Sequence, residues 1–252
     1  MVRELPPPRL VISYGRLLFG LSAIFFGIIA LRWHDAFTWQ SLHQFWRVPF
    51  GTVVGNALMA AQIVGGAGLL FGRSARAAAV ILGGVYSLFS IVCLPAIVAG
   101  PTAFDAYDGF FEQLSLLCGA LAAYAGTLWP PSPALRLATR LGLGACTVTF
   151  TLAQAIYLGA TAKLVPGWLP PNPTFWATVT TIAFGLTAVA LLANYQARLA
   201  SRLMSLMIAI FGLLVWVPLV FAHPSEHFNW SELALTFLIA GATQLVSDAM
   251  PE

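Results

Sequence analysis

The sequence predicts an all-α fold: a polytopic membrane helix bundle of about eight transmembrane helices, arranged as two parallel four-helix repeats. Three observations predict this class, namely the composition, a series of long apolar runs and a similarity between the two halves of the chain. Hydrophobic residues make up 59% of the 252 residues and charged residues 8%, whereas soluble domains have about 25% charged residues. So few charges cannot cover a surface in water, so the lipid bilayer is the expected environment. No basic patch suits nucleic acid.

Eight apolar runs follow one another, and each is close to the roughly 20 residues that a helix needs to cross hydrocarbon. Helices are expected because backbone groups in lipid need hydrogen-bond partners within their own segment. The first run follows a short basic, proline-rich leader and precedes no cleavage pattern, so we interpret it as an uncleaved helix. The runs cover about residues 10–31, 53–72, 76–99, 110–129, 137–160, 174–194, 200–221 and 232–247.

The positions of the cationic residues predict the orientation of these helices. Eight arginines fall at the N-terminus or in even-numbered connections, whereas only Arg32, Arg47 and Lys163 fall on the opposite side. Because cytoplasmic loops have an excess of Lys and Arg, we expect both termini in the cytoplasm and the protein in the cell (inner) membrane. All four histidines and six of the nine acidic residues then lie on or near the outer face.

The two halves of the sequence resemble each other. Residues 73–101 and 195–224 both contain an arginine-bearing turn, then an apolar run with a Leu-Pro or Val-Pro pair near its end. Each is followed by a loop and by a glutamate at the head of the next run, Glu112 or Glu232. Chance similarity between apolar helices is the alternative. The agreement in the order of prolines, arginines and glutamates favours a duplication.

The predicted units are residues 1–129, with the leader, and residues 130–252, separated by a proline-rich break. Each unit has four runs, an even number, so both copies enter the membrane in the same orientation. Such repeats are related by an axis along the membrane normal.

The second unit resembles the DoxX family of small membrane proteins. The resemblance rests on KLVPGWLPPNPTFWA (163–177), the turn at Arg198 and VPLVFAHPSEHFNWSELALTF (217–237), and is clearest over residues 145–248. It implies four-span units and a membrane oxidoreductase subunit, either quinone-linked or belonging to a complex that handles oxidative stress. Quinone is therefore the expected cofactor, ahead of metal or haem. The family has no agreed catalytic residue set that can be transferred to this sequence.

The loop AHPSEHFNWSE (222–232) supplies the first candidate site. His223 and His227 are four residues apart, and Pro224 suits the first position of a helix, which would bring both imidazoles and Glu226 together. Two imidazoles and a carboxylate can ligate zinc, copper or iron if His34 or Asp35 completes the set from the first outer loop. An interfacial loop held by hydrogen bonds is the alternative.

Glu112 and Glu232 are the other candidate groups. Each stands at the head of an apolar run, where a carboxylate either caps a helix or exchanges protons at the membrane edge. We expect the candidate catalytic residues to meet, with His34, Asp105 or Asp108, in one outward-facing cleft between the repeats. These residues are His223, Glu226, His227, Glu232 and Glu112.

Three functions remain open. The first is a redox subunit that uses quinone at the outer interface, and the second is a non-catalytic anchor or assembly module for a membrane or periplasmic partner protein. The third is a small-solute transporter, for which polar groups near the bilayer midplane are few: Gln62, Gln154 and Asn56. The three cysteines are far apart and lie in apolar runs, which argues against thiol–disulfide chemistry.

Overall fold

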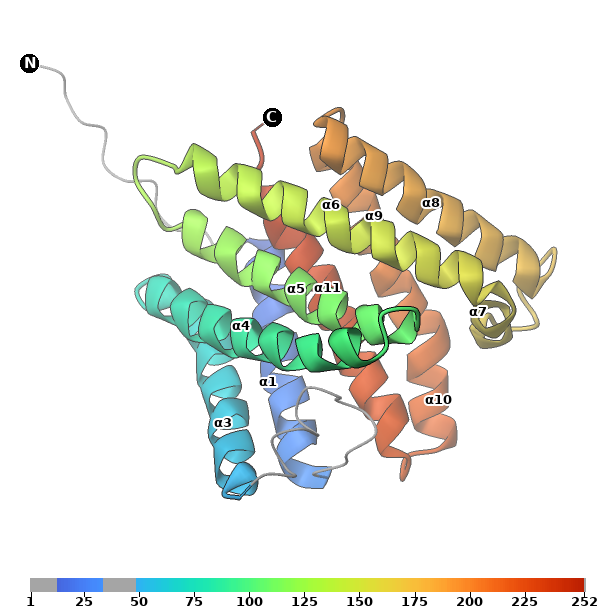
Figure 1. Ribbon diagram of the computed structural model, residues 1–252, viewed down its shortest axis with the longest axis horizontal. Helices are drawn as coiled ribbons and strands as arrows, with labels where there is room; N and C mark the ends of the chain where they lie inside the picture. The colour runs from blue at the N-terminus through green and yellow to red at the C-terminus, as the bar shows by residue number, and fades with distance from the viewer. Residues whose placement is uncertain (1–12, 34–48, 252) are drawn as a thin grey trace, which may run out of the picture.

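The computed structural model describes residues 13–33 and 49–251, which form helices and turns with no strand among them. The prediction of an all-α bundle is therefore confirmed for this part of the chain (Figure 1). The first half contains α1 (Tyr14–Trp33), α3 (Gly51–Leu69), α4 (Ala75–Ala99) and α5 (Asp105–Ala125). The second half contains α6 (Pro133–Ile156), α7 (Leu158–Leu164), α8 (Pro173–Ala193), α9 (Ala197–Phe211), the π-helical turn η1 (Gly212–Trp216), α10 (Val217–Ala222) and α11 (His227–Ala249).

Five helical segments are long and apolar enough to cross a membrane: α1, α3, α4, α8 and the continuous stretch α9–η1–α10. Helices α6 and α7 add a sixth if they form one span, although they meet at an angle of 89°. The runs expected at 110–129 and 232–247 form α5 and α11, which do not reach this standard. These helices are compatible with an integral, multi-pass membrane protein.

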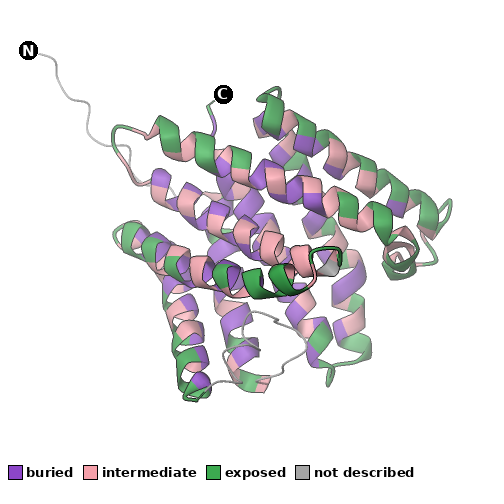
Figure 2. Ribbon diagram, viewed as in Figure 1, coloured by how far each residue is buried: buried purple, intermediate pink, exposed green. Residues whose placement is uncertain are grey.

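The distribution of polar and apolar side chains also suits a bilayer. Large apolar residues such as Val98, Ile182 and Leu186 are exposed on the outside of the bundle, whereas Gln62 and Ser201 are fully buried. Figure 2 shows this division, with exposed positions along the outer faces of α4, α6 and α8 and buried positions concentrated towards the middle. A soluble protein places its large apolar side chains in the opposite way.

Helix α11 lies in the middle of the bundle, where it packs against α1, α5 and α9 (Figure 1). Small residues let these helices approach closely. A Cβ added to Gly241 would lie 2.5 Å from the backbone nitrogen of Phe19, and one added to Gly119 would lie 2.6 Å from Cα of Ala242. Close packing at small residues is typical of helix interfaces in membranes. Because α11 is enclosed by other helices, it needs less apolar character than a helix that faces lipid.

The helices of the two halves make corresponding contacts. The pairs α1–α3, α3–α4 and α4–α5 in the first half match the pairs α6–α8, α8–α9 and α9–α11 in the second. Across the halves, α1 packs against α11 and α6 packs against α5. Each half thus places its first helix on the last helix of the other half.

The corners that follow α4 and α10 have the same backbone geometry. Gly100 ends α4 with φ −138° and ψ 66°, and His223 ends α10 with φ −134° and ψ 67°. A proline comes next in each corner, and its carbonyl oxygen accepts a hydrogen bond from an aromatic side chain six residues later. These bonds join Tyr107 Oη to Pro101 O at 3.0 Å and Trp230 Nε1 to Pro224 O at 2.9 Å.

Candidate functional site

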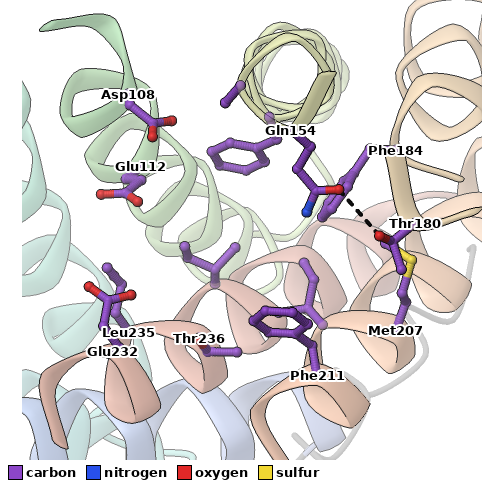
Figure 3. Close-up of a pocket in the computed structure, with 14 residues that line it drawn as sticks. Asp108, Glu112, Gln154, Thr180, Phe184, Met207, Phe211, Glu232, Leu235 and Thr236 are labelled. Carbon is purple, nitrogen blue, oxygen red and sulfur yellow. Dashed lines mark hydrogen bonds between the residues drawn. The ribbon is translucent and has the colours of Figure 1, made fainter. Parts of the chain in front are cut away.

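A cavity of about 210 Å³ lies where α5, α6, α8, α9 and α11 meet. Its lining is acidic on one side, because Asp108, Glu112 and Glu232 all contribute to it. Figure 3 shows these three carboxyl groups along one wall, from α5 and α11. The aromatic rings that contribute to the other walls belong to Phe150, Phe184 and Phe211.

Helix geometry explains how the carboxyl groups come together. Asp108 and Glu112 are four residues apart on α5 and therefore share one face of that helix. Helix α11 packs against α5 and adds Glu232. Glu112 lies seven residues after the start of α5, which is about 10 Å along the axis.

Neither glutamate caps a helix, so the capping interpretation is wrong for both. The N-cap positions of α5 and α11 are Phe104 and Glu226, and neither side chain makes a cap hydrogen bond. The carboxyl groups of Glu112 and Glu232 instead lie within the bundle at the cavity wall. An ionisable side chain at such a place is a functional-site candidate.

The wall opposite the carboxyl groups contains the side-chain amide of Gln154. Its Oε1 accepts hydrogen bonds from the hydroxyl groups of Thr180, at 3.3 Å, and Thr181, at 3.2 Å. Figure 3 shows Gln154 and Thr180 across the cavity from Glu112 and Glu232, with aromatic rings between. The cavity therefore has hydrogen-bonding groups at two ends and an apolar middle.

The histidine loop has a different conformation from the predicted one. Helix α11 begins at His227, and residues 223–226 form a turn closed by a hydrogen bond from the Glu226 backbone N–H to the His223 carbonyl, at 3.1 Å. His223 and His227 therefore do not lie on one helical turn, and that prediction is wrong. Pro224 lies in the turn and not at the first position of a helix.

The side chains of this loop do not line the cavity. His227 is 7% exposed, stacks on Trp33 with ring centroids 5.2 Å apart and shares a 3.0 Å hydrogen bond between Nε2 and Ser231 Oγ. Glu226 is exposed and accepts a hydrogen bond from Asn229 at 3.2 Å, and His223 is exposed as well. Within the described residues these contacts indicate a loop held by packing and hydrogen bonds.

The metal prediction depends partly on His34, which lies outside the described residues together with Asp35 and His43. The side chain of Asp105 is also outside them. Among residues 13–33 and 49–251, no group of three or more His, Cys, Asp or Glu side chains could hold a metal ion. Of the predicted cleft residues, Glu112, Glu232 and Asp108 thus come together at the cavity.

Sequence reasoning missed most of the other walls of the cavity. Most of the lining residues occur as pairs four apart, and each of the five helices has at least one: 108 and 112, 150 and 154, 180 and 184, 207 and 211, and 232 and 236 with 235 and 239. That spacing marks one face of a helix. It is also common in helices that have no site, so it does not reveal which faces meet.

Comparison with known proteins found no match to this chain, either among protein-family models, among curated proteins or among solved structures.

Proposed function

We propose that the protein is a DoxX-like membrane protein with eight spans in two parallel repeats and with both termini in the cytoplasm. The corresponding helix contacts of the two halves and the matching corners at Pro101 and Pro224 support the repeat. The excess of arginines at the N-terminus and in the even-numbered connections supports the orientation in the cell membrane. Helices α5 and α11 are then spans that other helices shield from lipid.

The proposed function is that of a redox subunit that binds a quinone or quinol in the cavity. One observation supports it most directly: the cavity has carboxyl groups at one end, an amide at the other and aromatic side chains between them. A quinone is a flat apolar ring with oxygen atoms at opposite ends. The lining residues fit such a ring, because pockets of this kind combine apolar walls with a few placed polar groups.

The side chains at the two ends have distinct roles in this proposal. Glu112 and Glu232 would accept a hydrogen bond from the hydroxyl group at their end of a quinol and take up the proton of that group, as carboxylates do in general base catalysis. Gln154, held by Thr180 and Thr181, fixes the other end of the ring. A bound quinone supplies two-electron, two-proton chemistry. The electrons of the quinol would pass to a redox-active partner protein in the membrane or periplasm, so the chain is proposed as a subunit of an oxidoreductase.

The placement of polar groups supports a transporter less than it supports quinone binding. Gln62 is fully buried, and its Nε2 donates a 3.0 Å hydrogen bond to the carbonyl oxygen of Ala23. This bond joins α3 to α1 and leaves Gln62 outside the lining of the cavity. Of the polar groups considered for transport, only Gln154 lines it.

The test measures quinone binding to the purified protein in lipid nanodiscs. We expect the double variant Glu112→Gln, Glu232→Gln to bind a short-chain quinol at least about tenfold more weakly, because a hydrogen bond to a charged group contributes about 1.5–3 kcal/mol. The matched control is Glu226→Gln, since Glu226 is exposed on the outer loop and does not line the cavity. That variant should bind as the parent does.

Two results would contradict the proposal. One is equal quinol affinity for the parent, the cavity variant and the control. The other is a protein that binds no quinone but still retains a partner protein, which would make it an anchor or assembly module. The absorbance spectrum and metal content of the same preparation test the weaker expectation of a metal or haem.

A further inference from the structure

A second, apolar hollow adjoins the acidic cavity. This groove has a volume of about 420 Å³ and lies between α8, α9, η1 and residues 165–169. Three residues line both the groove and the cavity: Thr180, Met207 and Phe211. The two hollows therefore lie next to each other, with these three side chains between them.

The groove opens on the outside of the bundle. Its walls are almost entirely apolar, and Leu206 and Ile210 on α9 are 56% and 45% exposed. On α8, Val179 is 37% exposed. In a bilayer these side chains face lipid, so the groove connects the hydrocarbon to the boundary residues. The cavity is then reached sideways from the membrane.

The backbone is irregular at this boundary. Phe211 is the last residue of α9, and the π-helical turn η1 begins at Gly212. A Cβ on Gly212 would lie 3.1 Å from the ring of Phe237, so a glycine allows close packing against α11 there. Single π-helical turns inside α-helices occur frequently at functional sites. Met207, one turn earlier, has a flexible side chain that adapts to different neighbours.

We infer that the groove holds the apolar chain of the ligand whose polar ring lies in the cavity. The ligand is thus an amphiphile with one long chain, and it enters from the bilayer between α8 and α9, past Thr180, Met207 and Phe211. This inference rests on the proposed function of the cavity. It adds the class of ligand and the route by which the ligand arrives.

The physical chemistry decides how the inference is tested. A chain that moves from lipid into an apolar groove leaves one hydrocarbon environment for another, so it gains little from the hydrophobic effect. Affinity alone therefore says little about the groove. The position of the chain is the informative measurement.

The probe is a benzoquinone with a decyl chain that ends in a photoreactive diazirine. It is added to the protein in lipid nanodiscs, illuminated, and the labelled residues are identified by mass spectrometry. We expect the label on groove residues such as Val179, Leu206 and Ile210. Excess benzoquinone with a methyl group in place of the chain should remove this label, because it competes for the cavity.

Two tryptophan variants form a matched pair. Ile210→Trp fills the groove and should remove most of the groove label, whereas Leu199→Trp should leave it unchanged. Leu199 is also on α9 and is 52% exposed, but it lines neither hollow. Quinol binding measured with the methyl compound should be the same in both variants, because the ring does not reach the groove.

The inference is overturned if the label spreads over lipid-facing residues and Ile210→Trp does not change it. It is also overturned if a diazirine-bearing phosphatidylcholine labels the groove and the methyl benzoquinone does not displace it, since an ordinary lipid would then be the occupant. Failure of the proposed function is distinguishable. In that case Glu112→Gln, Glu232→Gln would leave binding of the methyl compound unchanged.

Discussion

In the first half of the molecule, the rings of Phe19, Tyr86 and Phe89 pack together and are completely buried, with centroids 5.9 Å apart for Phe19 and Tyr86 and 6.4 Å for Tyr86 and Phe89. In the proposed repeat, a shift of 123 residues, which takes Pro101 to Pro224, gives the matching positions in the second half. Those positions hold small residues: Gly142, Ala209 and Gly212.

The two halves differ in side-chain volume at these positions, and they also differ in how much they contribute to the two hollows. The acidic cavity and the apolar groove are both lined mainly by residues of the second half, with Asp108 and Glu112 added from α5. The first half fills its interior with aromatic rings, whereas the second half surrounds most of both hollows.

The same shift does not align the two glutamates. It places Glu232 at the position of Gly109 and Glu112 at that of Leu235, so the two glutamates are not equivalent and differ by about one helical turn. They meet at one cavity because α5 packs against α11. The shift also takes Gly119 to Ala242, and these two residues contact each other. The proposed repeat, with a twofold axis between α5 and α11, requires such a contact between residues at matching positions.

The largest expected effect is the side of the membrane from which introduced cysteines react. It depends on how the two halves are oriented in the membrane, and it is all or none. Phe71→Cys and Tyr195→Cys, in the exposed turns before α4 and α9, should react with a membrane-impermeant thiol reagent only from the cytoplasmic side. Thr102→Cys and Ser225→Cys, in the matching outer corners, should react only from outside. Cys93, Cys118 and Cys146 are buried, which keeps the background low. Reaction of Phe71→Cys and Tyr195→Cys from opposite sides would mean an inverted repeat.

A smaller effect is expected at two equivalent helix crossings. A Cβ on Gly241 would meet the backbone of Phe19, whereas a Cβ on Gly142 would meet only the Cys118 thiol, at 2.6 Å. Gly241→Ala should therefore lower the free energy of unfolding by about 1–3 kcal/mol, the usual range for overpacking. Gly142→Ala should lower the free energy of unfolding by less, because the Cys118 thiol is at the end of a side chain and can move aside. Denaturant titration in mixed micelles gives both values, and equal costs would contradict this difference between the halves.

The first helix of each half has an arginine near its start that bonds to the end of the next helix. Arg16 is 7% exposed and donates from Nε and Nη2 to the Leu69 carbonyl, at 3.1 and 2.6 Å. Arg140 is half-buried and donates from Nη1 to the Leu191 and Leu192 carbonyls.

Arg16→Met should cost about 1.5–3 kcal/mol of stability, as expected for buried hydrogen bonds from a charged group. Arg140→Met should cost about 1 kcal/mol or less, because water screens a more exposed charge. Thermal unfolding compares the stability of the two variants. A larger loss of stability for Arg140→Met would contradict the expectation that the more buried arginine contributes more.

The smallest effect concerns the starts of helices. In the second half, Asn172 Oδ1 accepts from the Phe175 backbone N–H at 2.9 Å, whereas the corresponding helix α3 has no side-chain cap bond. Asn172→Ala should lower stability by about 1 kcal/mol. Ser132→Ala should cost less, because its cap bond to Leu135 is longer, at 3.4 Å. The same unfolding measurements decide this, and no loss for Asn172→Ala would show that the cap of α8 is unimportant.

The sequence by itself determined where the helices lie but not all of their ends, because α5 and α11 each begin five residues before the runs expected at 110–129 and 232–247. The run at 76–99 corresponds to α4, and the run at 174–194 to α8, within one residue at each end. Hydropathy is a local property, and a helix that satisfies its own backbone in lipid needs no distant partner. The sequence also identified Glu112 and Glu232 as candidate residues, because a carboxylate within an apolar run stands out without any knowledge of the tertiary structure.

Only the tertiary structure decided which side chains face those carboxyl groups. Gln154 and Thr180 became part of the site because α6 and α8 pack against each other and border the same hollow as α5 and α11. In a membrane most faces of a helix are apolar, so hydropathy does not show which face meets which neighbour. Close packing at small residues such as Gly119 and Gly241 sets that choice. The turn at Pro224 likewise separates His223 from His227, because the backbone there bonds to itself before α11 begins.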